Sequence, residues 1–74
     1  MPNKQKARDP KVDPAKGDVF RGPRSERTIQ YRNGFVIAYR TTLLRNRQER
    51  KTDSIQAITQ FRKWAKDAEV IHAH

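Results

Sequence analysis

Residues 27–42, RTIQYRNGFVIAYRTT, form two β-prone runs on either side of an Asn-Gly pair. Asn33-Gly34 is the dipeptide preferred in two-residue type I′ hairpin turns, because both central residues of that turn need positive φ. In the corresponding register, Tyr31 faces Val36 across the hairpin. The pattern predicts an antiparallel hairpin, and any fold of this chain has to be built around it.

The second run of this hairpin is apolar on both faces. Phe35, Ile37 and Tyr39 point to one side, and the residues between them, which point to the other side, are also apolar. A strand with two apolar faces is typical of the centre of a sheet, so we expect a third strand beside it. The shorter stretch DVFR, residues 18–21, precedes a Gly-Pro turn signal and predicts an edge strand.

The chain between Leu44 and Ile55 contains four basic residues and no apolar residue. This composition predicts a long, exposed hairpin loop. Residues 51–56 are compatible either with the third strand or with the start of a helix, because Asp53 and Gln56 can form a capping box.

A helix is predicted at residues 57–68. At about 100° per residue, the apolar side chains of this segment fall on one stripe. Residues 70–71 lie outside the stripe, which predicts an extended tail after the helix. The stripe consists of Ala57, Ile58, Phe61, Trp64, Ala65 and Ala68.

Trp64 is the only tryptophan in the chain. It could anchor the core, stack on a nucleobase or fill a pocket on a partner. A small sheet needs a large side chain above it to form a core, and a buried tryptophan contributes a large apolar area. We therefore expect Trp64 to be structural, which leaves Phe35 and Tyr39 as candidates for stacking on a nucleobase.

Residues 1–17 hold three of the four prolines and, beyond Met1, one sizeable apolar side chain, Val12. Such a segment cannot bury enough apolar surface to offset the entropy lost on ordering. We expect a disordered basic tail at residues 1–17 and one folded domain at residues 18–74. The predicted fold class is α+β: a small two- or three-stranded antiparallel sheet, one C-terminal helix and the disordered tail.

The formal net charge of +9 and a pI of about 10.7 set the expected partners. They predict fast, salt-sensitive association with nucleic acid, an anionic membrane or an acidic protein surface. The absence of cysteine is compatible with a reducing, intracellular setting. No apolar run approaches the length of a membrane span, and the N-terminus lacks the apolar core of a signal peptide. We expect a cytoplasmic monomer without a membrane partner.

The sequence offers little for catalysis. The two histidines, His72 and His74, lie in the last three residues, where catalytic positioning is not expected. As an H-x-H pair they lack the third ligand of a zinc site. Ser25 and Ser54 have no histidine nearby in sequence, and three glycines form no phosphate-binding loop. We expect neither an enzyme nor a bound metal or cofactor.

Two basic clusters are the candidate partner-binding sites. One lies in the predicted loop and the other on the outward face of the predicted helix. Paired arginines can bind phosphates or carboxylates through two parallel hydrogen bonds. The alternative for each cluster is a solvated surface that keeps a small protein soluble. The candidates are Arg45, Arg47, Arg50 and Lys51 in the loop, and Arg62, Lys63 and Lys66 on the helix.

Three stretches, KGDVFRGP, YRNGFVIAYR and QFRKWAKDAEVI, resemble a type of short protein encoded by phages and prophages. Those proteins share a Gly-Asp-Val start, a three-stranded sheet and a closing F-x-x-W-A-x-x-A-E helix, and the match covers roughly residues 16–71. In size, charge and layout the chain also looks like the small phage regulators that bind host RNA polymerase, inhibiting initiation and suppressing termination. The matching residues are Gly17, Asp18, Val19, Phe61, Trp64, Ala65, Ala68 and Glu69.

The resemblance implies a non-enzymatic module that binds bacterial RNA polymerase and modulates transcription, by inhibition of initiation, antitermination or both. Contacts between its arginines and an acidic polymerase surface would set orientation and encounter rate more than affinity. The alternative is direct binding of DNA or RNA through phosphates, with a steep dependence on salt. Phosphate binding should depend on several clusters additively, whereas a protein interface should concentrate in a few arginines and a neighbouring apolar contact.

Overall fold

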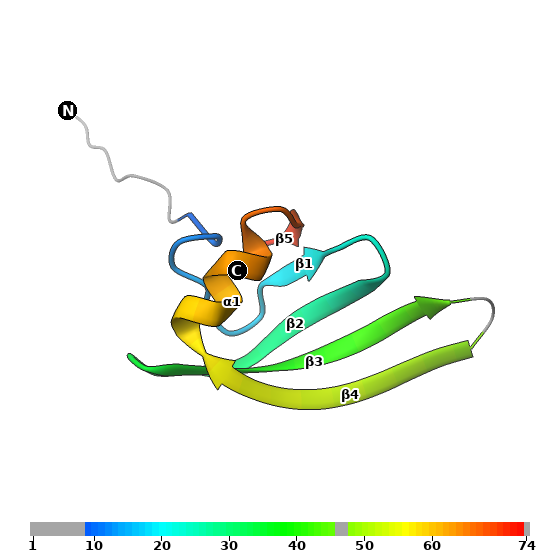
Figure 1. Ribbon diagram of the computed structural model, residues 1–74, viewed down its shortest axis with the longest axis horizontal. Coiled ribbons are helices and arrows are strands. Elements are labelled where there is room, and N and C mark those ends of the chain that lie inside the picture. Colours follow the sequence, from blue (N-terminus) through cyan, green and yellow to red (C-terminus); the bar gives the residue numbers. More distant parts are fainter. Residues whose placement is uncertain (1–8, 46–47, 74) are drawn as a thin grey trace.

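In the part of the chain that the structure describes, five antiparallel strands form one sheet that packs against a short helix (Figure 1). The computed structural model describes residues 9–45 and 48–73. The strand order is β4-β3-β2-β1-β5, and every neighbouring pair is antiparallel. The elements are β1 (Val19–Arg21), β2 (Ser25–Arg32), β3 (Val36–Arg45), β4 (Gln48–Ala57), α1 (Ile58–Ala65) and β5 (Glu69–His72).

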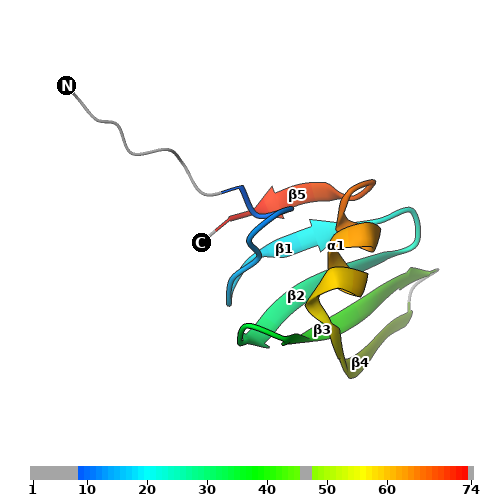
Figure 2. The ribbon, with the colours of Figure 1, turned by 60° about the vertical axis from the view of Figure 1, so that its left-hand side comes forward.

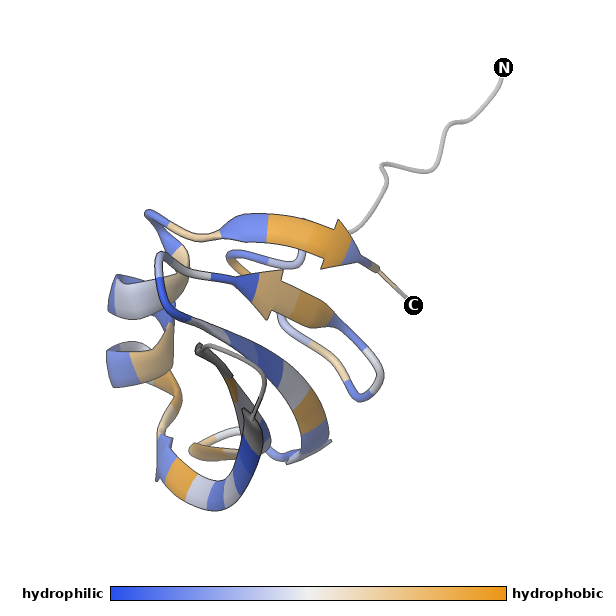
Figure 3. Ribbon diagram, turned by 90° about the vertical axis from the view of Figure 1, so that its right-hand side faces the viewer, coloured by the Kyte–Doolittle hydropathy of each residue, from blue (hydrophilic) through white to orange (hydrophobic). Residues whose placement is uncertain are grey.

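This β-rich architecture corrects the expected two- or three-stranded sheet with a C-terminal helix. Helix α1 carries the chain from β4 at one edge of the sheet to β5 at the other edge. Residues 70–71, expected in an extended tail, belong to β5, which Figure 3 shows as a hydrophobic stretch with hydrophilic ends. The tail prediction is wrong because so short an apolar segment has no recognisable period. Since β5 pairs with β1, residues 18–21 are not at an edge of the sheet either.

The predicted hairpin forms between β2 and β3, and β3 lies inside the sheet, as its two apolar faces indicate. Its register differs from the prediction, because Tyr31 lies opposite Ala38 rather than Val36. A bulge interrupts the pairing between Ile29 and Tyr31. A bulge inserts one extra residue and so reverses the alternation of the side chains. Ile29 can therefore face the core while Tyr31 faces solvent.

The turn of this hairpin depends on the side chain of Asn33. Its Oδ1 accepts hydrogen bonds from the backbone N–H groups of Phe35 and Val36, at 2.8 and 2.9 Å. Among the described glycines the positive φ occurs at Gly17, at 96°, and not at Gly34. The type I′ prediction is therefore wrong, because an asparagine that bonds its own following backbone can close a turn without left-handed residues.

The polar segment between Leu44 and Ile55 is mostly strand rather than a long loop. Strand β3 runs to Arg45 and β4 begins at Gln48, with unbroken pairing along both strands. The loop prediction is wrong because β4 is an edge strand with exposed side chains on both faces over most of its length. Hydrophobic alternation reveals a strand only where one face is buried. The same pairing assigns residues 51–56 to a strand.

The core lies between α1 and the face of the sheet that the helix crosses (Figure 2). Phe61 of α1 is fully buried and meets Phe20 of β1 edge to face, with 5.3 Å between the ring centroids. Trp64 is partly buried and packs against this core from its margin, so the large side chain at the centre is Phe61 rather than Trp64. The other members of the core cluster are Ile29, Ile37, Tyr39, Ala65 and Ala68.

Residues 9–17, which the sequence assigns to the tail, lie against the folded domain. Pro14 is buried, and its carbonyl oxygen accepts a hydrogen bond from Nη1 of Arg32 at 2.8 Å. The carbonyl oxygen of Val12 accepts a hydrogen bond from Nε of Arg62 at 2.7 Å. This segment therefore packs on both β2 and α1, and the rest of the predicted tail lies outside the described residues.

Candidate functional site

The sheet has two faces with different chemistry. Helix α1 lies on one face, called here the helix side; within the described residues no helix lies on the other, the open side (Figure 2). Residues directly opposite each other on neighbouring strands point to the same face. Because Phe20, Ile29 and Tyr39 are buried beneath α1, the strand register assigns a face to each paired residue.

A row of apolar side chains crosses the open side. Tyr31 of β2 lies opposite Ala38 of β3, which in turn lies opposite Ile55 of β4. Tyr31 is 53% exposed and Ile55 is 65% exposed. Phe35, in the turn between β2 and β3, is 82% exposed. Tyr31, Ala38 and Ile55, named the apolar row below, form an uncharged strip across three strands.

Opposite charges are paired on the open side next to this row. Nε of Arg40 donates to Oδ1 of Asp53 at 2.8 Å, and Nη2 donates to Oδ2 at 3.2 Å. Farther along the sheet, Nη2 of Arg21 donates to Oε2 of Glu26 at 2.6 Å. Hydrogen bonding from Arg40 lowers the pKa of Asp53 below its ordinary value. These pairs balance the charge around the apolar row.

We expect a titration followed by NMR to give Asp53 a pKa below that of an ordinary aspartate, because Arg40 stabilises the charged carboxylate. The pair contributes stability above the ordinary pKa, and this contribution disappears as pH falls through the lowered value. The contribution is small because both side chains are exposed. Arg40→Gln should restore the ordinary pKa and Arg21→Gln should not change it. The same Asp53 pKa in all three proteins would contradict the pairing.

On the helix side, Arg27 of β2 lies over two aromatic rings. Its guanidinium carbon is 4.0 Å from the ring centre of Trp64 and 4.7 Å from that of Tyr39. Within residues 9–45 and 48–73 it forms no ion pair, and its buried Nε has no hydrogen-bond acceptor. Partial burial lowers the pKa of Arg27, and its interaction with Tyr39 opposes that effect. Arginine stays protonated in proteins, so Arg27 is a cation positioned by aromatic contacts.

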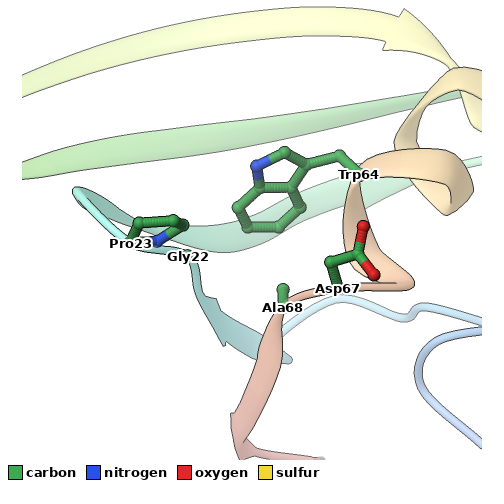
Figure 4. A pocket seen from close by; sticks show the side chains of 5 residues that line it. All are labelled: Gly22, Pro23, Trp64, Asp67 and Ala68. Atoms are coloured by element: carbon green, nitrogen blue, oxygen red, sulfur yellow. The ribbon is translucent and has the colours of Figure 1, made fainter.

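The Trp64 ring also lines a small open pocket (Figure 4). Gly22 and Pro23, in the turn between β1 and β2, form one end, and Asp67 and Ala68, after α1, form the other. The volume is about 150 Å³, below the roughly 300–1,000 Å³ of sites for drug-sized ligands. A Cβ on Gly22 would lie 3.0 Å from Cζ2 of Trp64, so glycine permits this close approach. The pocket can accept one side chain or one planar ring.

Positive charge dominates the helix side. The acidic residues Glu26, Asp53 and Glu69 lie on the open side, as the register of their strands shows. On the helix side, Asp67 lies beside the Trp64 pocket. Arg32, which points to the helix side because it lies opposite Ile37, forms an ion pair with Asp13. Other cations on the helix side and in the adjacent turn form no ion pair with a described residue, and they include Arg24, Arg27, Arg50 and Lys63.

The structure divides the first predicted basic cluster. Arg50 and Lys51 are consecutive in β4, so Arg50 points to the helix side and Lys51 to the open side. Arg45 is the last residue of β3, and its side chain lies outside the described part of the structure, as does all of Arg47. Arg50 is thus the member of this cluster that shares a face with Arg27.

The second predicted cluster is also divided. Arg62 binds the carbonyl oxygen of Val12, and the carbonyl oxygen of Lys66 accepts a hydrogen bond from Nζ of Lys11 at 3.1 Å. Arg62 therefore has a structural contact with the N-terminal segment. Lys63 is exposed and is the direct neighbour of Trp64 in α1.

Sequence reasoning missed Arg27 and the apolar row. Arg27 belongs to no run of basic residues, and its place over Trp64 depends on long-range packing of α1 on β2. The exposure of Tyr31 depends on the bulge in β2, which no residue pattern indicates. Of the two predicted stacking candidates, Tyr39 is 5% exposed and belongs to the core, whereas Phe35 is exposed.

Residues 9–45 and 48–73 contain no group of three or more His, Cys, Asp or Glu side chains placed to hold a metal ion. In the same residues no helix combines the length and apolar character needed to cross a membrane. His72 is exposed on β5 opposite Val19, and His74 lies outside the described residues.

Comparison with known proteins gives no match: no family model, no curated protein and no solved structure matches this chain. The fold and the two faces define a small β-rich domain with a basic helix side and an apolar row on the open side. Its function has to follow from the chemistry of these two faces.

Proposed function

We propose that this protein is a non-enzymatic binding module that docks on another protein through the apolar row. The observation that carries this function is the exposure of Tyr31 and Ile55, which are both more than half exposed in one row of the sheet. Covering such side chains contributes about 25 cal/mol for each Å² of apolar surface removed from water, and the entropy cost of association is subtracted from this gain. The Arg40–Asp53 pair beside the row fits the polar rim that surrounds the apolar centre of a protein interface.

Bacterial RNA polymerase is the partner that the resemblance to phage regulators implies. A net charge of +9 would attract an acidic surface and orient the protein before contact. In this arrangement the apolar row supplies affinity, and the cations of the helix side raise the encounter rate. A monomer bound in this way would modulate transcription in the bacterial cytoplasm, by inhibition of initiation, antitermination or both.

Ile55→Lys separates docking through the apolar row from general attraction by charge. It removes one member of the row but adds a positive charge, and it should weaken polymerase binding by about tenfold or more. Thr52→Lys is the matched control, because it adds the same charge at an exposed position of β4 that points to the helix side. Pull-down from nuclease-treated bacterial lysate identifies the polymerase subunits, and titration with purified polymerase gives the affinities.

Both variants replace exposed side chains, so NMR spectra should show the native fold in each. Equal polymerase affinity of Ile55→Lys and Thr52→Lys would mean that the apolar row is not the docking surface. Failure of the unmodified protein to bind purified polymerase would contradict this choice of partner.

Direct binding of nucleic acid is a second candidate function, favoured by the cations of the helix side that no described acid neutralises. Binding through phosphates releases counterions, so affinity should fall steeply as salt is raised. Ile55→Lys and Thr52→Lys should then both bind nucleic acid at least as tightly as the unmodified protein, because each adds a positive charge. Docking through the apolar row instead predicts that Ile55→Lys weakens binding of the protein partner and that Thr52→Lys does not.

A further inference from the structure

Trp64 brings together a fixed cation, an acid and an accessible aromatic surface. Arg27 lies over its ring, and the ring also lines the pocket that includes Pro23 and Asp67 (Figure 4). Because Trp64 is only partly buried, part of the indole is available to a ligand. The pocket volume of about 150 Å³ suits one planar ring rather than a whole small molecule.

The charges around this pocket suit an anionic chain. Arg24 is exposed in the turn that carries one end of the pocket, and Lys63 is exposed beside Trp64 on α1. Arg50 points to the same face from β4. Arg27 holds its charge without an acidic partner among the described residues. A backbone with one negative charge per nucleotide can pass from one of these cations to the next.

Two other classes of ligand fit less well. A cationic side chain of a partner would approach a ring that already lies against Arg27, and it would be repelled by Arg24 and Lys63. An acidic peptide would place its carboxylates beside Asp67. A nucleobase is neutral and aromatic, and the amino groups of cytosine, adenine and guanine can donate hydrogen bonds to a carboxylate.

We infer that the Trp64 pocket binds single-stranded nucleic acid, with one base stacked on the indole and the adjacent phosphates at Arg27 and the neighbouring cations. We infer single-stranded rather than duplex nucleic acid, because bases in a duplex stack on each other and do not offer a free face to an aromatic side chain. Asp67 favours bases that carry an amino group. The site lies on the helix side, so it is independent of docking through the apolar row on the open side.

Fluorescence of the one tryptophan tests the stacking directly. A single-stranded oligonucleotide of about 12 nucleotides, within the site sizes of known single-strand-binding domains, should quench Trp64 when it binds. Anisotropy of the labelled oligonucleotide gives the affinity, which should fall as salt is raised. Duplex DNA of the same sequence should bind more weakly and without quenching. Equal quenching by the duplex, or none by the single strand, would overturn the inference.

Arg27→Gln and Arg40→Gln distinguish this site from general attraction by charge. Each removes one guanidinium group, but Arg27 lies over Trp64 and Arg40 lies on the open side. We expect Arg27→Gln to weaken binding by about tenfold, the scale of losing one charged or stacked contact. Arg40→Gln should have little effect. With native NMR spectra for both variants, equal losses of affinity would reduce the interaction to non-specific charge and overturn the site.

Asp67→Ala tests the selectivity for bases. The unmodified protein should bind oligo(dC) more tightly than oligo(dT), which lacks the amino group, and the variant should lose this preference. Affinity for oligo(dT) should rise in the variant, because a negative charge near the phosphates is removed and no hydrogen bond to the base is lost. Equal affinities in the unmodified protein would remove Asp67 from the site. If a polyglutamate peptide quenches Trp64 and displaces the oligonucleotide at a similar concentration, the pocket binds acidic protein segments and the inference is wrong.

Discussion

Phe61→Ala should remove most of the folding stability of this domain. Phe61 is fully buried, and its ring contacts those of Phe20, Tyr39 and Trp64 at centroid distances of 5.3, 5.4 and 5.6 Å. Truncating a buried phenylalanine to alanine costs about 3–5 kcal/mol, because the cavity is only partly refilled. A domain of this size has only about 5–10 kcal/mol in total. Thermal unfolding followed by circular dichroism should show a Tm lower by at least about 15 °C.

Trp64→Ala is the natural comparison, and it should be less damaging. Trp64 packs at the margin of the core and is partly buried, so its loss leaves a smaller cavity beside Phe61. The variant should keep a dispersed NMR spectrum, although Arg27 loses the ring over which it lies. If Trp64→Ala unfolds while Phe61→Ala stays folded, the core is centred on the tryptophan, as the sequence alone predicts.

The contrast between these two aromatic residues shows what helical periodicity can and cannot predict. The 3.6-residue period correctly groups Phe61 and Trp64 on one stripe. It does not say which residue lies at the middle of the stripe, because that depends on the strand beneath. Phe20 of β1 lies under Phe61, and Arg27 of β2 lies against Trp64. The strand register, and not the helix, therefore determines which aromatic residue is central.

Strands β4 and β5 escape prediction for different reasons. Strand β4 is a polar edge strand with both faces largely exposed, so apolar and polar residues do not alternate along it. Strand β5 has four residues, and it pairs with β1 across most of the described sequence. Local patterns carry no information about such distant pairing. The hairpin of β2 and β3 is local and strongly apolar, and its existence is predicted correctly.

The candidate sites, like the strands, depend on long-range packing that local sequence patterns do not predict. Net charge and basic clusters can be read from the sequence, but the face to which each side chain points depends on register. Arg50 and Lys51 are adjacent in the chain and point to opposite sides of the sheet. Arg27 stands apart from the basic clusters, yet the fold places it over two aromatic rings. A charge cluster in the sequence is therefore not the same as a charged surface.

Asp18→Ala should loosen the N-terminal segment and destabilise the domain by about 2 kcal/mol or more, the cost of leaving a buried polar group without its charged partner. Asp18 is fully buried, and its Oδ2 accepts a hydrogen bond from the backbone N–H of Ala15 at 2.9 Å. The Asp18 carbonyl oxygen also accepts from the N–H of Ile29, which joins the segment to β2. Denaturant unfolding gives the loss of stability, and hydrogen exchange at Ala15 shows whether the loss is local.

Asp9→Ala is the matched control for this prediction, because Asp9 makes the same kind of bond in an exposed place. Its Oδ1 accepts from the backbone N–H of Lys11 at 3.0 Å, where water can replace the carboxylate. A small effect of Asp9→Ala beside a large effect of Asp18→Ala would locate the stabilisation in the burial of the bond. Equal effects would mean that the segment is held by its own turn and not by Asp18. In the expected case, Arg62 would also lose its contact with Val12 and become available to a partner.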